Sequence, residues 1–124
     1  IHGENNFPFK KEQSDLDLGL VDGCKDAEYL HSLKQCLSEL DSHFKADFLI
    51  FLAGADPHQG DRLGRLNITK DGMRQRDELV FQYALDRQLP IAFSMAGGYG
   101  KEIESTVDIH FQTIKTALKF QKQY

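Results

Sequence analysis

Residues 48–57 read FLIFLAGADP, an apolar run that stops abruptly at the acidic residue Asp56. This pattern predicts a buried strand with a carboxylate at its carboxyl end, where open α/β sheets place their functional residues. A second apolar run, residues 91–95, leads into a glycine turn at residues 96–100 that contains Tyr99. Because parallel strands end at the same edge of a sheet, we expect Asp56 and Tyr99 to be the leading functional residues of one site.

The rest of the chain alternates predicted strands and helices. Leucine at every second position predicts a strand over residues 15–21. Apolar residues at three- and four-residue steps then predict an amphipathic helix, with Asp26 as a candidate cap. Two further helices are expected, one from the N-cap Thr69 to about residue 88 and one over residues 101–119. This order predicts an α/β fold, with a parallel sheet and helices on its faces.

The composition is typical of a single soluble domain. The chain has 124 residues, of which 40% are hydrophobic and 27% charged, and its formal net charge is −4. Its basic residues are scattered among acids, so we expect no nucleic-acid binding. No apolar run approaches the roughly 20 residues of a membrane helix, so we expect no membrane span. Cys24 and Cys36 lack the spacing of a disulfide framework or a zinc site, which favours reduced thiols and a cytoplasmic location.

Asp56 opens a polar segment, residues 56–67, that is longer than the roughly 2 to 6 residues of an ordinary strand-to-helix connection. Its carboxylate could cap a turn or bind a divalent zinc or iron ion, and local spacing leaves both interpretations open. We expect the loop histidine His58 to be solvated. Asp61 and Arg62 are expected to pair with each other or to brace the loop.

The glycine turn at residues 97–100 also has more than one interpretation. Its backbone N–H groups could hold a phosphate or nucleotide in a non-catalytic binding module of doubly wound type. The established phosphate-binding glycine patterns are absent, however, and Glu102 and Glu104 add negative charge there. Alternatively, the glycines let a substrate approach and the Tyr99 hydroxyl polarises a carbonyl. The third interpretation is an ordinary glycine turn with a packed tyrosine.

Nucleophilic catalysis has no support in the sequence. No Ser/His/Asp or Cys/His set can be assembled from local spacing. The remaining histidines form no pair with metal-ligand spacing, and His110 is expected to be a hydrogen-bonded core residue on the last helix.

Several segments together resemble the zinc-dependent histone deacetylase family, in particular its bacterial deacetylase-like members. The order and spacing of these segments carry the resemblance along nearly the whole chain. It implies the arginase/deacetylase-type α/β fold, with a parallel sheet covered by helices on both faces. The matching segments are IHGENNFP at 1–8, DG at 22–23, LAGADP at 52–57, GDRLG at 60–64, LNIT at 66–69 and AGGY at 96–99.

The resemblance also implies roles for single residues. Asp56 falls on one of the two aspartates that hold the family's catalytic metal, which is Zn²⁺ with Fe²⁺ as the alternative. Tyr99 falls on the catalytic tyrosine, whose hydroxyl stabilises the oxyanion formed when water attacks an acetyl group. Gly97 and Gly98 would line the narrow acyl channel, and Leu63 would lie on its wall.

Part of the family pattern is absent from this sequence. The family's other metal ligands belong to an Asp-x-Asp-x-His segment, and its histidine pair lies further upstream; neither occurs here. Residues 1–124 are therefore expected to be the C-terminal portion of a single deacetylase-like α/β domain. The parent protein would remove acetyl or similar acyl groups from lysine side chains or small amines. The chain alone would be an inactive fragment that needs the N-terminal portion of the same domain as its partner, or a degenerate member serving as an interaction surface.

Overall fold

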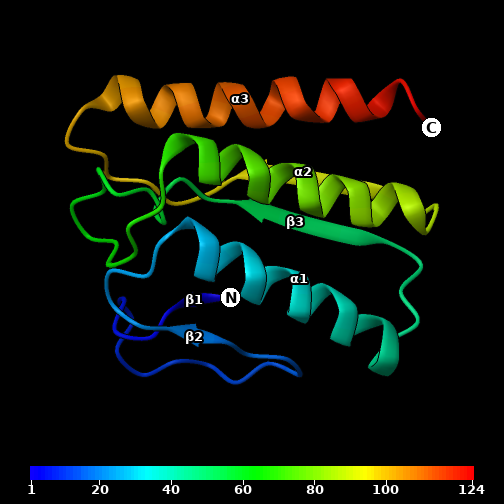
Figure 1. Cartoon of the computed structure of the whole chain (residues 1–124), viewed down its shortest axis with the longest axis horizontal. Coiled ribbons are helices and arrows are strands. Elements are labelled where there is room, and N and C mark those ends of the chain that lie inside the picture. The colour runs from blue at the N-terminus through cyan, green and yellow to red at the C-terminus, as the bar shows by residue number, and fades with distance from the viewer.

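The computed structural model describes residues 1–124 and contains four strands and three helices (Figure 1). No helix in it combines the length and the apolar character that crossing a membrane requires. In chain order, the elements are β1 (His2–Gly3), β2 (Gly19–Leu20), α1 (Asp26–His43), β3 (Leu49–Ala53), α2 (Lys70–Asp86), β4 (Ile91–Met95) and α3 (Ile103–Gln121).

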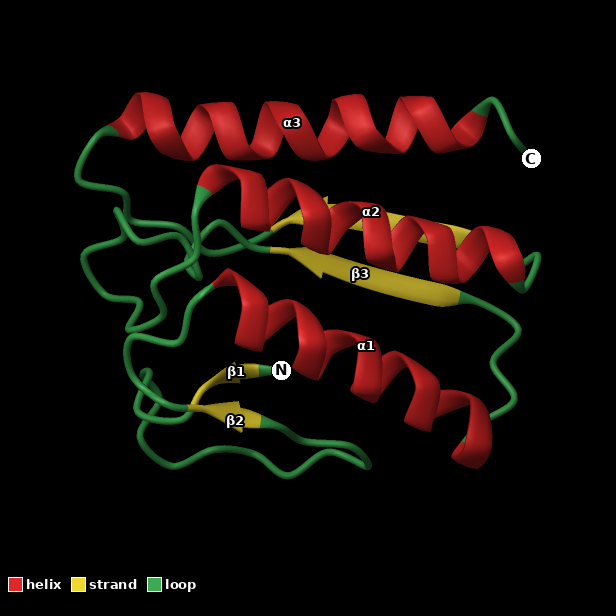
Figure 2. Cartoon of the chain, viewed as in Figure 1, coloured by secondary structure: helices red, strands yellow, loops and turns green.

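Strands β3 and β4 form the parallel pair that positions the candidate site. Their register runs from Leu49 opposite Ile91 to Ala53 opposite Met95. Helix α2 connects them, so the unit is a strand, a helix and a parallel strand (Figure 2). This arrangement confirms the predicted α/β class. Since both strands end at the same edge, the loops that follow them start side by side.

Strand β2 is shorter than the alternation over residues 15–21 predicted. Only two residues are extended, and they pair in parallel with β1, which also has two residues. The Glu4 N–H donates to the Leu20 carbonyl just beyond this ladder. The prediction of a strand over the whole segment is therefore wrong, because a strand extends only as far as its partner offers backbone hydrogen bonds.

Helix α2 covers one face of the β3–β4 pair and packs against α1 on one side and α3 on the other (Figure 1). Its Phe81 is buried, and the Phe81 ring centre lies 5.9 Å from that of Phe51 and 5.4 Å from that of Phe93. On the opposite face of β3, Ile50 and Leu52 are 71% and 68% exposed. The expectation that the whole apolar run is buried is therefore wrong, because the helices of this chain pack against one face of this strand pair.

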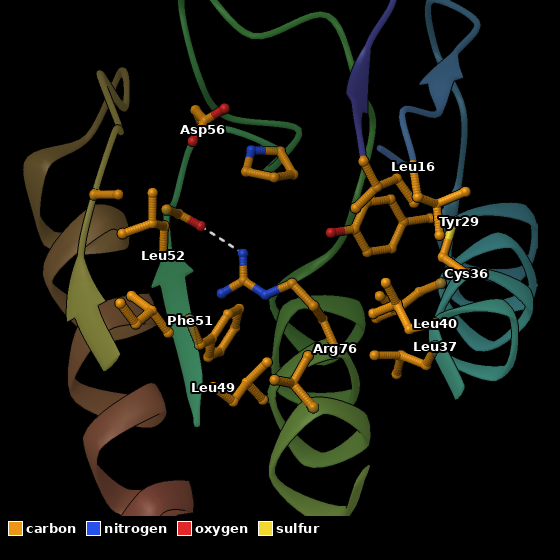
Figure 3. Close-up of a pocket in the computed structure, with 17 residues that line it drawn as sticks. Leu16, Tyr29, Cys36, Leu37, Leu40, Leu49, Phe51, Leu52, Asp56 and Arg76 are labelled. Atoms are coloured by element: carbon orange, nitrogen blue, oxygen red, sulfur yellow. Dashed lines mark hydrogen bonds between the residues drawn. The ribbon is translucent and has the colours of Figure 1, made fainter. Parts of the chain in front are cut away.

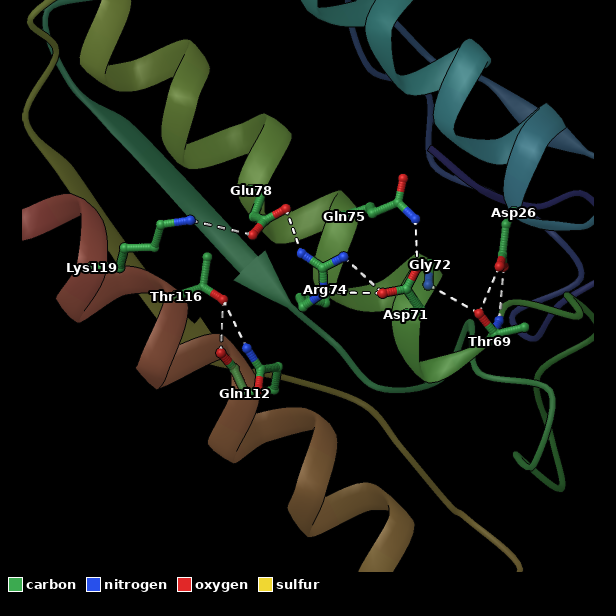
Figure 4. A network of polar contacts seen from close by, with 10 residues as sticks. All are labelled: Asp26, Thr69, Asp71, Gly72, Arg74, Gln75, Glu78, Gln112, Thr116 and Lys119. Carbon is green, nitrogen blue, oxygen red and sulfur yellow. Dashed lines mark hydrogen bonds and ion pairs between the residues drawn. The ribbon is translucent and has the colours of Figure 1, made fainter.

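The N-termini of α1 and α2 are joined by one carboxylate (Figure 4). Thr69 caps α2 as predicted, since its hydroxyl oxygen accepts a hydrogen bond from the Gly72 N–H at 3.0 Å. Asp26 does not cap α1, whose N-cap is Lys25 without a side-chain hydrogen bond. Instead, Asp26 accepts hydrogen bonds from the Thr69 N–H at 2.8 Å and from the Thr69 hydroxyl at 2.6 Å. Asp26 therefore braces the cap of the other helix.

His110 on α3 is partly buried, and its Nδ1 has no hydrogen-bond partner. The expected hydrogen-bonded core histidine is therefore not observed. Burial lowers the pKa of His110, because removal from water disfavours the imidazolium, and the positive charge of Arg76 lowers it further, while Asp77 opposes both. Folding therefore favours the uncharged imidazole of His110 relative to the unfolded chain.

Acidification is expected to destabilise the chain through His110. The pKa of His110 in the folded chain lies below the unfolded value of about 6.5. The contribution of His110 to the free energy of unfolding is therefore fully present above about pH 6.5 and is lost as the pH falls toward the folded pKa. The pKa of His58 is lowered too, chiefly by burial, so His110 accounts for part of the loss. Urea unfolding at pH 7.5 and 5.5 should show a smaller pH dependence for His110→Gln than for the unaltered chain.

The matched control for this measurement is His31→Gln, which replaces an exposed histidine on α1. It should leave the difference in unfolding free energy between the two pH values unchanged. An equal pH dependence in His110→Gln and in the unaltered chain would contradict the assignment to His110.

Candidate functional site

The candidate site is built from two interlocked loops that follow β3 and β4. The Ala55 N–H donates to the Gly97 carbonyl at 2.6 Å. The Arg62 N–H donates to the Tyr99 carbonyl at 3.0 Å, and the Lys101 N–H donates to the Gly60 carbonyl at 2.8 Å. These three bonds tie residues 54–64 to residues 96–101 along their length, so the structure brings the two predicted segments together.

Asp56 lies at the start of the first loop, and its carboxylate rests against the second. A methyl group on Gly97 would lie 3.0 Å from Asp56 Oδ1, closer than a side chain comfortably allows. Burial raises the pKa of Asp56, since desolvation disfavours the charged carboxylate. The Asp56 backbone N–H opposes this shift by hydrogen bonding, the negative charge of Asp61 adds to it, and Arg76 opposes it. A carboxylate held where its charge is unfavourable is typical of a functional position.

Tyr99 and Leu63 lie on the outer side of the same loops. Their side chains are 58% and 65% exposed, respectively. The turn before Tyr99 requires glycine at Gly98, which has a φ of +152°, and a methyl group there would lie 2.9 Å from Ala55 Cβ. The hydrogen bonds between the loops therefore fix the position of the Tyr99 backbone, while more than half of the Tyr99 residue surface stays exposed.

A cavity of about 530 Å³ opens between α1 and β3, with Asp56 at one end (Figure 3). Its walls are mostly apolar, and its polar lining includes Tyr29 and Arg76. Of the predicted site residues, only Asp56 borders this cavity. Tyr99, Leu63 and the glycines of the second loop do not line it. The structure thus joins the predicted residues through their backbones rather than around one enclosed pocket.

Sequence reasoning missed the buried ion pair behind the site. Arg76 and Asp77 on α2 are 4% and 1% exposed. Arg76 Nη1 donates to the carbonyl of Gly54 at 2.5 Å, and Arg76 Nε donates to Asp77 Oδ1 at 2.8 Å. Asp77 Oδ2 accepts from the Thr113 hydroxyl on α3 at 2.6 Å. The helical spacing could have revealed this pair, because Arg76 and Asp77 fall between the apolar residues Met73 and Val80 on the buried side of α2.

The His58 prediction is corrected by the structure. This histidine is 8% exposed rather than solvated, and its Nδ1 accepts the Gly60 N–H at 3.1 Å. The loop folds back over its ring, which removes it from water. Asp61 and Arg62 brace the loop as predicted, each through hydrogen bonds to the Tyr99 backbone.

The glycine turn is poorly suited to a phosphate. The Tyr99 N–H of the turn already donates to the Asp61 carboxylate, and the Lys101 N–H just after the turn donates to the Gly60 carbonyl. The buried Asp61 carboxylate also lies against the Tyr99 N–H, so its negative charge would repel an anion there. This geometry argues against the nucleotide-binding alternative.

The residues of this chain do not form a metal site by themselves. No group of three histidine, cysteine, aspartate or glutamate side chains is arranged to hold a metal ion. Protein zinc sites use at least three such ligands. The chain by itself therefore offers fewer ligands than a protein zinc site needs.

The chain belongs to the histone deacetylase family, because the family profile described as the histone deacetylase domain matches residues 2–114. The family consists of deacetylase-type hydrolases. An uncharacterized protein of Picosynechococcus sp. is 44% identical over 110 residues, covering 89% of this chain and 37% of its own length. Histone deacetylase 2 of Arabidopsis thaliana is 36% identical over 87 residues, covering 70% of this chain and 22% of its own length.

Solved structures support the same fold. An HDAC homolog from Aquifex aeolicus matches with a TM-score of 0.76 and 20% sequence identity over 91% of this chain. An HDAC homolog in complex with SAHA matches with a TM-score of 0.75 over the same share. The chain covers 32% of each of these two structures and 37% or less of the two curated relatives. The arginase/deacetylase-type fold is thereby confirmed.

Proposed function

We propose that this chain supplies one side of the active site of a metal-dependent deacetylase that acts on acetylated lysine side chains or small acetylated amines. The observation that carries the proposal is the interlock of the two loops, which holds Asp56 and the Tyr99 backbone at one edge of a parallel sheet. Membership of the histone deacetylase family and the likeness to an HDAC homolog complexed with SAHA support this chemistry.

In this proposal, Asp56 is one ligand of a Zn²⁺ ion, with Fe²⁺ as the alternative. The metal, when bound, supplies the Lewis acidity that activates water and polarises the amide carbonyl. The Tyr99 hydroxyl donates a hydrogen bond to the developing oxyanion. The backbone at Gly97 and Gly98 leaves room for the acyl group, and Leu63 forms part of the wall beside it.

The missing ligands would come from the N-terminal portion of the same domain. The chain spans about a third of the lengths of the structures it resembles, and the apolar side chains of Ile50 and Leu52 are exposed on one face of β3. We therefore expect residues 1–124 alone to be inactive and to gain activity when that portion is supplied.

The free thiols of Cys24 and Cys36 support a cytoplasmic location.

Substitutions at Asp56 and Tyr99 test this proposal in the completed domain. Tyr99→Phe removes one hydrogen-bond donor and should lower kcat about 10²- to 10³-fold without loss of bound zinc. Asp56→Asn should lower both the bound zinc and the activity, because it removes a charged ligand. The measurements are acetate release from an acetyl-lysine peptide and zinc per protein.

Tyr124→Phe is the matched control, since its hydroxyl bonds the Leu89 carbonyl far from the loops. It should leave both quantities unchanged. Full activity in both Asp56→Asn and Tyr99→Phe would refute the proposed roles.

A further inference from the structure

Asp61 occupies the junction between the two loops. The residue is 8% exposed. Its Oδ1 accepts hydrogen bonds from the Leu63 N–H at 2.8 Å and from the Gly64 N–H at 2.7 Å. Its Oδ2 accepts the Tyr99 N–H at 2.5 Å. One buried carboxylate therefore fixes the turn of its own loop and reaches across to the other.

The Tyr99 backbone is held at both of its polar groups. The Asp61 carboxylate accepts a hydrogen bond from the Tyr99 N–H. The Tyr99 carbonyl accepts hydrogen bonds from the Arg62 N–H at 3.0 Å and from Arg62 Nε at 3.2 Å. The Tyr99 side chain, by contrast, is 58% exposed and gains little support from packing. The backbone contacts, rather than a packed wall, therefore determine where this chain presents the tyrosine.

We propose that Asp61 is a positioning residue for Tyr99, which it aims at the reacting carbonyl by holding its N–H. This inference rests on the proposed role of the Tyr99 hydroxyl. Charge-assisted hydrogen bonds donated to a carboxylate are shorter and stronger than neutral ones, which suits a group that must hold its position. A displacement of about 1 Å at a catalytic group can cost about 100-fold in rate.

The chemistry requires two acceptor oxygens at residue 61. An asparagine offers one oxygen, which can keep the Leu63 and Gly64 N–H bonds, and one amide that cannot accept the Tyr99 N–H. Asp61→Asn is therefore nearly isosteric and selectively breaks the bond between the loops.

A double-mutant cycle in the zinc-loaded, completed domain tests the inference. The four proteins are the unaltered domain, Asp61→Asn, Tyr99→Phe and the double variant, compared by kcat, KM and zinc per protein. Asp61→Asn should lower kcat about 100-fold with bound zinc retained. In the Tyr99→Phe background, the same change should cost no more than about threefold, because the hydroxyl that it positions is already gone.

A purely structural role of Asp61 would give a different pattern of kcat values across the four proteins. Losses that multiply in the double variant, or an unchanged kcat in Asp61→Asn, would overturn the inference. If Tyr99→Phe alone were fully active, the proposed role of the Tyr99 hydroxyl would fail, which separates that outcome from a failure of the inference about Asp61. Asp108→Asn, an exposed aspartate of α3 paired with Lys70, is the matched control and should leave kcat unchanged. If Asp61→Asn does not fold, Asp61→Glu replaces it in the cycle: it retains both acceptors but displaces Tyr99, so the same non-additive loss is expected.

Discussion

Replacement of Arg76 by methionine is expected to lower the free energy of unfolding by about 3–5 kcal/mol, the cost of leaving one member of a buried ion pair uncompensated. Asp77 would remain at 1% exposure with only the Thr113 hydroxyl as a partner. The Gly54 carbonyl would also lose its donor, two residues before Asp56. Urea unfolding of the chain, followed by circular dichroism, measures the loss.

Two further variants show whether the buried charge causes this loss. Arg74→Met removes an arginine on the same helix whose ion pairs with Asp71 and Glu78 are partly exposed, so it should cost about 1 kcal/mol or less. The double variant Arg76→Met/Asp77→Leu should recover part of the stability lost in Arg76→Met, because no charge is then left buried. Equal losses of unfolding free energy for Arg74→Met and Arg76→Met would show that the buried Arg76–Asp77 pair contributes no more to stability than an exposed ion pair.

The Arg76 contacts link stability to the candidate site. Arg76 Nη2 lies 2.7 Å from Asp77 Oδ1 but is not aligned for a hydrogen bond, so one buried amino group of the guanidinium is left without a hydrogen-bond partner. The ion pair is therefore imperfect, although it joins the end of β3 to α2 and α3. This arrangement supports the end of β3 that leads into Asp56, at the cost of one unsatisfied buried amino group.

Replacement of Phe81 by alanine is the second large effect, with an expected loss of about 3–5 kcal/mol. Phe81 is 3% exposed and makes edge-to-face contacts with Phe51 and Phe93 and a stacked contact with Phe120, whose ring centre is 6.0 Å away. Removing the ring opens a cavity where α2, α3 and both strands meet. The denaturant midpoint of Phe81→Ala, compared with that of the unaltered chain, gives the measurement.

Phe111→Ala provides the control for this cavity. Phe111 on α3 is 60% exposed, and its removal should change the unfolding free energy by no more than about 0.5 kcal/mol. Phe81→Leu should be tolerated better than Phe81→Ala, since it leaves a smaller void. A loss of under about 1 kcal/mol for Phe81→Ala would show that the aromatic cluster is not the centre of the core.

Local patterns predicted the parts of the fold that depend on neighbouring residues. The Thr69 cap and the strands before Asp56 and Tyr99 were found because each is encoded within a few residues. The strand over residues 15–21 failed, since its length depends on a partner elsewhere in the chain. Asp26 was assigned to the wrong helix for the same reason: its hydrogen bonds join residues 43 apart in sequence.

The sequence by itself determined the α/β class, the two loops and the candidate residues Asp56 and Tyr99, because apolar runs ending in acids or glycines are local signals. Only the tertiary structure revealed that Asp61 holds the Tyr99 backbone across 38 residues and that Arg76 reaches Gly54 across 22. It also showed which face of β3 is covered. Such features depend on which groups are buried together, and the spacing of residues along one chain does not specify that.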